Sequence, residues 1–144
     1  MISKRIIISR TDSIGDVVLT LPMTGIIKEQ YPDSKILFLG RTYTKPVVSL
    51  CKHVDEFVNW DDLQKQENPV DAFTALNADV IIHVFPNKEI ARLALKAKIA
   101  TRIGTKGRFF HLFTCNKKVS FSRRKSVLHE AQLNLKLLQP LKMQ

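Results

Sequence analysis

The sequence predicts an α/β fold, a Rossmann-like parallel sheet with helices on both faces. Short apolar runs bounded by turn residues, such as residues 6–8 and 35–39, are typical of strands that are buried on both sides. The segments between these runs carry apolar residues near a period of 3.6, which indicates helices. Strands that alternate with helices imply right-handed crossovers and therefore a parallel sheet.

The first strand, residues 6–9, leads through a tight loop into a helix that we expect to continue as far as Tyr31. Pro32 follows this helix, and residues 35–39 form the second strand. A short helix over residues 45–50 has Pro46 in its first turn, where proline is tolerated. The other expected elements are a strand at 54–60, a helix at 69–76, a strand at 79–84, a helix at 88–98 with Asn87 as N-cap, a strand at 101–104, a helix or irregular segment at 109–113, a strand at 117–121 and a helix at 126–138.

Length and composition indicate one globular domain spanning residues 1–144. The 44% hydrophobic and 25% charged residues are ordinary for a soluble protein. No apolar run is long enough to span a bilayer, and the amino terminus does not resemble a signal peptide, so we expect a cytoplasmic protein. The four histidines and two cysteines have no metal-ligand spacing, so we expect no metal site.

The loop after the first strand is the best candidate for a site, because open parallel sheets bind ligands at the carboxyl ends of their strands. Ser13 and Gly15 flank the start of the next helix, where unpaired N–H groups can bind an anion. Gly15 allows a close backbone approach or a positive φ. By position alone, Asp16 stabilises its own helix dipole. The loop lacks the G-x-G-x-x-G and Walker A patterns of nucleotide sites.

The string IIISRTDSIGDVVLTLP, followed by KEQYPDSKILFLGR, resembles the amino-terminal region of glycosyltransferase family 9, the bacterial ADP-heptose:lipopolysaccharide heptosyltransferases. The sharpest motif is Ser13-Ile14-Gly15-Asp16-Val17-Val18 with Thr20 and Pro22. Residues 78–82 and 102–104 fit as the fourth and fifth strands, and residues 129–130 and 134–135 fit near the end. The resemblance covers most of the chain.

This resemblance implies the amino-terminal half of a GT-B fold, in which two Rossmann-like domains face each other across a cleft. This chain would be the acceptor-binding domain of an enzyme that transfers heptose from ADP-heptose to the lipopolysaccharide inner core. The carboxyl-terminal domain, which binds the sugar nucleotide in the family, has no counterpart here, so we expect this fragment alone to be inactive and to carry no cofactor. The motif's aspartate is the family's proposed base, and Asp16 takes that role here.

Three further residues are candidates for binding the acceptor. Arg10 and Arg41 follow the first and second strands, where a planar guanidinium could bind a carboxylate or phosphate. Each could equally be solvated or paired with Asp12 or another loop acid. Ser13 could donate to a bound sugar or phosphate, or act only as the N-cap of the helix.

The positive charge is concentrated in the last two fifths of the chain. Residues 88–144 carry a net charge of +12 and residues 1–87 a net charge of −2. Within residues 106–125, seven bases surround three phenylalanines: Lys106, Arg108, Lys117, Lys118, Arg123, Arg124 and Lys125, with Phe109, Phe110 and Phe113. Such a region could contact phosphorylated lipid A and the anionic inner face of the bacterial inner membrane, or serve solubility alone.

Two other classes of function remain open from the sequence. The chain could be a non-catalytic binding module or a truncated remnant of this fold. A nucleic-acid-binding domain is suggested by the pI near 9.9, but the sequence has no zinc-finger spacing, RNP-type strand or basic recognition helix. We therefore expect no specific nucleic-acid partner.

Overall fold

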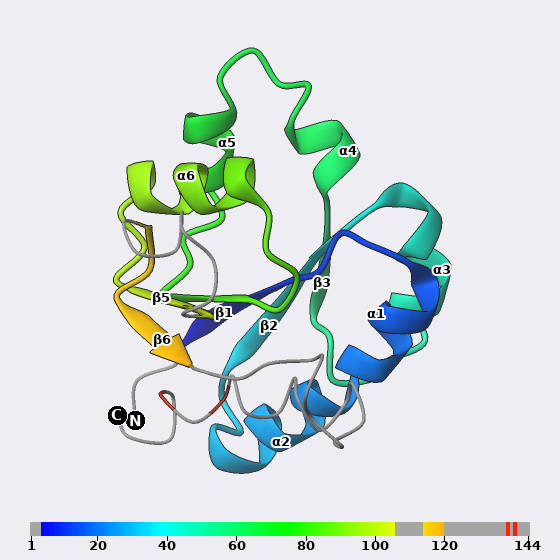
Figure 1. Ribbon diagram of the computed structural model, residues 1–144. Coiled ribbons are helices and arrows are strands. Elements are labelled where there is room, and N and C mark those ends of the chain that lie inside the picture. The colour runs from blue at the N-terminus through cyan, green and yellow to red at the C-terminus, as the bar shows by residue number, and fades with distance from the viewer. Residues whose placement is uncertain (1–3, 106–113, 120–137, 139, 141–144) are drawn as a thin grey trace.

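A parallel sheet forms the centre of the computed structural model, which describes residues 4–105, 114–119, 138 and 140. Within these residues the sheet has six strands in the order β3-β2-β1-β4-β5-β6 (Figure 1). The strands are β1 Arg5–Ser9, β2 Lys35–Gly40, β3 Glu56–Asn59, β4 Val80–His83, β5 Thr101–Thr105 and β6 Lys117–Val119. Every pairing is parallel, so the predicted Rossmann-like α/β fold is confirmed.

Helices cover both faces of the sheet, as predicted (Figure 1). The helices are α1 Ile14–Thr20, α2 Pro22–Gln30, α3 Lys45–Val48, α4 Trp60–Leu63, α5 Pro69–Thr74 and α6 Lys88–Lys96, with a 3₁₀ turn, η1, at Thr42–Thr44. Helices α1 to α3 share a core with the side chains of Ile6 and Ile8. Helices α4 to α6 pack on the opposite face, around Ile7. Alternate residues of β1 thus supply two separate cores, which explains its unbroken apolar run.

The single helix predicted from residue 17 to Tyr31 is wrong in one respect, because Pro22 divides it into α1 and α2. Proline has no N–H to donate to the preceding turn, and its ring crowds the carbonyl four residues earlier. The backbone tightens at this point, with the N–H of Thr24 donating to the carbonyl of Leu21 at 3.0 Å. The division gives α2 its own direction under the sheet (Figure 1).

The other predicted elements within the described residues follow the predicted order, with bounds that differ by a few residues, and the short helix α4 was not predicted. The strand expected at 54–60 ends at Asn59, because Asn59 caps α4 by accepting from the N–H of Asp62 at 3.2 Å. Asn87 caps α6 as predicted and accepts from the N–H of Ile90 at 3.0 Å. The segments expected at 109–113 and 126–137 lie outside the described residues.

The strand order places the first loop at a topological switch point. From β1 the chain proceeds to β2 and β3 on one side, while β4, β5 and β6 extend on the other. The loops after β1 and β4 therefore leave the sheet in opposite directions, and ligands of open α/β sheets bind between such loops. The N–H groups of Val84 and Phe85 both donate to the carbonyl of Ser9 at 3.1 Å, which fixes the two loops side by side.

Candidate functional site

Ser13 sets the position of Asp16 at the start of α1. The backbone of Ser13 is extended, and its hydroxyl accepts from the N–H of Asp16 at 3.5 Å, so the N-cap role considered from the sequence is confirmed. The same hydroxyl donates to Oδ2 of the Asp16 side chain at 2.6 Å. One serine therefore both begins the helix and orients the carboxylate that the motif singled out.

Arg10 is buried beneath this loop, with only 4% of its side chain exposed. Its Nε and Nη2 donate to the two carboxylate oxygens of Asp12 at 2.8 and 3.0 Å, which is bidentate pairing. Its Nη2 also lies 3.5 Å from Oδ1 of Asp16. The pairing with Asp12, one of the two alternatives open from the sequence, is therefore what the structure contains. In this arrangement the guanidinium faces the loop's own carboxylates.

Asp12 and Asp16 differ in their surroundings although Arg10 contacts both. Burial raises the pKa of Asp12, the guanidinium of Arg10 opposes this increase, and the nearby charge of Asp16 adds to it. The side chain of Asp16 is 39% exposed, about twice the exposed fraction of Asp12. Asp16 is therefore the carboxylate of this loop that a ligand can reach, and Asp12 holds Arg10 in place below it.

Two contributors to this loop were missed in the sequence. The hydroxyl of Thr20 accepts from Nη1 of Arg10 at 3.4 Å and donates to the carbonyl of Asp16 at 2.9 Å, which joins the end of α1 to its start. The phenol of Tyr43 donates to the carbonyl of Asp12 at 2.5 Å from a position 31 residues away. Thr20 belongs to the quoted motif, but no sequence signal connects Tyr43 to this loop.

Gly15 lies in the first turn of α1 with a helical backbone. None of the glycines in the described residues has a positive φ, so of the two alternatives open from the sequence for Gly15, the positive φ is not found. A Cβ at this position would meet no atom within 4 Å. The absence of a side chain leaves open space beside Asp16, consistent with the predicted close approach of a ligand.

Arg41 belongs to a separate cluster at the carboxyl end of β2. Its Nε donates to Oδ1 of Asp61 at 2.7 Å, and the N–H of Thr42 donates to the other carboxylate oxygen at 2.8 Å. This hydrogen bond from Thr42 and the one from Arg41 outweigh the effect of burial and lower the pKa of Asp61. Arg41 is thus paired with a loop acid, yet 45% of its side chain stays exposed.

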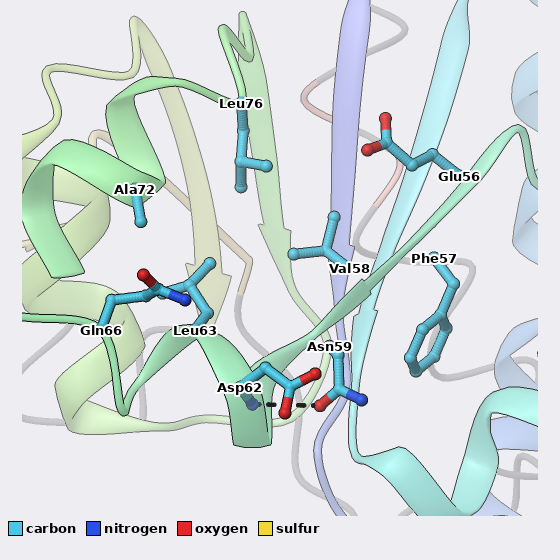
Figure 2. A pocket seen from close by; sticks show the side chains of 9 residues that line it. All are labelled: Glu56, Phe57, Val58, Asn59, Asp62, Leu63, Gln66, Ala72 and Leu76. Atoms are coloured by element: carbon cyan, nitrogen blue, oxygen red, sulfur yellow. Dashed lines mark hydrogen bonds between the residues drawn. The ribbon is translucent and has the colours of Figure 1, made fainter.

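A hollow of about 310 Å³ lies elsewhere, against the edge strand β3 and helices α4 and α5. Figure 2 shows the nine residues that line it: Glu56, Phe57, Val58, Asn59, Asp62, Leu63, Gln66, Ala72 and Leu76. None of them is a predicted site residue, and their only drawn hydrogen bond is the helix cap between Asn59 and Asp62. The loop after β1 therefore remains the candidate site.

The described residues contain neither a cluster of metal-ligating side chains nor a membrane-spanning helix. In residues 4–105, 114–119, 138 and 140, no three His, Cys, Asp or Glu side chains lie together as metal ligands would. Within the same part of the chain, no helix has the length and hydropathy needed to cross a bilayer. Most of the basic cluster predicted at 106–125 lies outside the described residues.

The known proteins to which this chain is similar are described as glycosyltransferases. No family model matches the chain. A Haemophilus influenzae protein described as a "Putative glycosyltransferase" is 24% identical over 138 residues, which are 94% of this chain and 40% of that protein. E. coli heptosyltransferase WaaC with ADP superposes with a TM-score of 0.75 at 21% identity, over 94% of this chain and 46% of WaaC. A family 9 glycosyl transferase from Veillonella parvula superposes with a TM-score of 0.74 at 20% identity, over 98% of this chain and 42% of that one.

These likenesses show that the chain has the fold of part of a family 9 heptosyltransferase. They confirm, at the level of fold, the resemblance that the motif around Asp16 indicated. The chain spans less than half the length of the relatives it matches. More than half of each of these relatives therefore has no counterpart in the aligned residues.

Proposed function

We propose that this chain is the acceptor-binding, amino-terminal domain of a glycosyltransferase that transfers heptose from ADP-heptose to the inner core of lipopolysaccharide. The fold and the coverage of the relatives support this assignment, because the chain matches one α/β unit of proteins more than twice its length. ADP-heptose is the donor in this proposal, and it is bound mainly by a second, carboxyl-terminal domain. The 144-residue chain alone is then inactive.

One observation carries the assignment of Asp16 as the general base. Asp16 presents a solvent-accessible carboxylate at the switch point of the sheet, and neighbouring side chains orient both of its oxygens. Ser13 donates to one oxygen, and Arg10 lies near the other. A sugar hydroxyl is a weak nucleophile and needs such a group to accept its proton during the attack.

The proposed step is a single displacement. The acceptor hydroxyl attacks the anomeric carbon of the heptose while its proton passes to Asp16, and ADP leaves with the electrons of the broken bond. The configuration at that carbon inverts, as the resemblance to family 9 implies. Gly15 leaves room beside the carboxylate for the acceptor.

Arg10 and Arg41 have different roles in this proposal. Arg10 acts through the carboxylates that it contacts, because its guanidinium is buried against Asp12. Arg41 is the exposed cation, and among the described residues it hydrogen-bonds through Nε alone, to Asp61. Its terminal nitrogens are suited to an acidic or phosphorylated group of the acceptor.

Replacing Asp16 by Asn in a protein that contains both this chain and a donor-binding domain tests the base. We expect transfer from ADP-heptose to an inner-core acceptor to fall by about 10²- to 10⁴-fold, mainly in kcat. Asp62→Asn is a matched control, since Asp62 also lies in a first helical turn below a capping side chain. Both changes remove similar helix-dipole stabilisation, about 0.3–1 kcal/mol.

Two results would contradict the assignment. Wild-type turnover in Asp16→Asn would remove Asp16 from the chemistry and leave a non-catalytic binding module as the better description. An equal loss in Asp62→Asn would show that the effect of Asp16 comes from helix stability.

A further inference from the structure

The exposed apolar side chains of this protein are gathered in one place. Six large hydrophobic residues are exposed in the part of the chain that the structure describes, and five of them lie on α1, on η1 or just after α3. These three elements pack against one another (Figure 1). We call this surface the α1–α3 patch, and it consists of Ile14, Val18, Leu19, Tyr43 and Leu50.

Leu50 is the most conspicuous member because 86% of it is exposed. A leucine that is exposed to this extent contributes almost no buried apolar surface to the fold. Several such side chains on one surface mark an interaction site. The sixth exposed residue, Leu95, lies on α6, which packs on the opposite face of the sheet. The gathering is thus specific to the face formed by α1, η1 and α3.

The charges around the patch are mixed: Lys45 and Lys52 are exposed, whereas Arg41 is paired with Asp61. Residues 41–54, which include η1 and α3, contain Arg41, Lys45 and Lys52 and no acid. All three side chains are exposed, and Lys45 and Lys52 lie on either side of Leu50 in the sequence. The only acid exposed to a comparable extent on α1 is Asp16, which Ser13 and Arg10 contact.

We infer that the α1–α3 patch is a docking surface for an anionic lipid bilayer. Apolar side chains beside lysines fit the interface of such a membrane, where the apolar groups enter the headgroup boundary and the bases attract acidic lipids. A second copy of the chain fits less well, because a symmetric contact would bring Lys45 and Lys52 of one copy towards the same lysines of the other. Nucleic acid would leave the exposed leucine unexplained.

The inference deepens the proposed function and rests on it for its biological sense. Asp16 lies one turn before Leu19 on α1, so a membrane at the patch would place a lipid-linked acceptor near the proposed base. The sequence left open whether residues 106–125 contact a membrane, and the patch consists of other residues, between 14 and 50.

Vesicle binding by the 144-residue chain tests the inference without a donor or an acceptor. Affinity for vesicles of phosphatidylcholine mixed with phosphatidylglycerol is compared for wild type, Leu50→Asp and the matched control Leu95→Asp. We expect Leu50→Asp to weaken binding by about tenfold or more, from the lost burial of one leucine. Leu95→Asp should bind within about twofold of wild type, and circular dichroism melting checks that both variants are folded.

A second set of variants in the same vesicle assay distinguishes the lysines beside the patch from bases elsewhere in the chain. Replacing Lys45 and Lys52 together by Gln should weaken binding by roughly 30-fold, because each base near an anionic surface contributes about a fivefold effect. The matched double change at Lys65 and Lys96, which are exposed and lie outside the patch, removes the same net charge and should have a smaller effect.

Several outcomes would overturn the inference. Equal effects of Leu50→Asp and Leu95→Asp, or of the two lysine pairs, would show that binding follows net charge alone. Dimers in lipid-free sedimentation that Leu50→Asp dissociates would assign the patch to a second copy. None of these results affects transfer by Asp16, because the vesicle assay contains no sugar nucleotide, and the Asp16→Asn transfer assay can be done with a lipid-free acceptor.

Discussion

Replacing Arg10 by Met tests whether the buried ion pair of the loop contributes more to stability than an ordinary surface pair does. Methionine keeps most of the aliphatic volume and removes the guanidinium, so Asp12 loses two charge-assisted hydrogen bonds at 2.8 and 3.0 Å. Removing one partner of a buried pair leaves the other charge uncompensated, which typically costs 3–5 kcal/mol. Because Asp12 keeps some contact with water, we expect about 3 kcal/mol, the lower end of this range.

Arg41→Met is the matched control in the same protein. The Arg41 pair has a similar Nε to Oδ1 distance, 2.7 Å, but its arginine side chain is 45% exposed. Exposed pairs contribute 0.2–1 kcal/mol. With a urea m value of about 2 kcal/mol/M, Arg10→Met should lower the midpoint of unfolding by about 1.5 M and Arg41→Met by about 0.5 M or less. Equal shifts would refute the reasoning from burial.

The pH dependence of Arg10→Met gives an independent check. Burial raises the pKa of Asp12 and Arg10 opposes this, so the folded-state pKa of Asp12 should rise further in the variant. An acid whose folded pKa is raised destabilises the protein once it ionises, so the cost is present at neutral pH. It should shrink as the pH falls toward 4. Asp12→Asn in the Arg10→Met background should recover part of the lost stability at pH 7, and no recovery would contradict the role of Asp12.

The remaining predictions concern one charge network and two glycines. Asp55 accepts from Lys28 at 2.7 Å; burial raises its pKa, but the hydrogen bonds and nearby positive charges outweigh burial and lower it overall. Its stabilisation is therefore present above its ordinary pKa of 3.8 and lost as the pH falls through the lowered value. The cost of Asp55→Asn, about 1–2 kcal/mol at pH 7, should therefore shrink as the pH falls below 3.8 in urea melts. A constant difference between pH 7 and pH 2 would contradict this. Gly40→Ala should cost about 1–2 kcal/mol, because the added Cβ would lie 3.1 Å from the hydroxyl of Thr44. The same change at Gly15 meets no atom within 4 Å and should leave stability unchanged or slightly higher while weakening acceptor binding; equal losses of stability at both glycines would contradict the packing argument.

Much of the fold could be predicted because the three central strands β1, β2 and β4 are short apolar runs between turn residues. The sequence did not reveal the break at Pro22, since apolar residues continue through it at helical spacing and hide the missing N–H. Trp60 was assigned to a strand because it continues a weak alternation, whereas the cap formed by Asn59 begins α4 there. In both cases a backbone N–H decided the boundary: it is missing at Pro22, and at Asp62 it donates to the side chain of Asn59. Side-chain periodicity does not report either feature.

The candidate site was predictable in its location and only partly in its contacts. Ser13 and Asp16 are three residues apart, so their cap geometry follows from the local sequence. The sequence left open whether Arg10 faces a ligand or Asp12, because that choice depends on burial by the surrounding fold. Tyr43 reaches the loop from a distant turn through a single hydrogen bond, and no local pattern encodes such a contact.

The central claim is that this chain binds the acceptor next to Asp16 and that the donor is bound elsewhere. A ¹⁵N NMR titration of the 144-residue chain tests this most directly, with a lipid-free inner-core oligosaccharide in one series and ADP-heptose in the other. We predict that the oligosaccharide shifts the amide signals of residues 12–18 and that ADP-heptose leaves them unchanged. Shifts of these amides by ADP-heptose, with none from the oligosaccharide, would contradict the assignment of this domain to the acceptor.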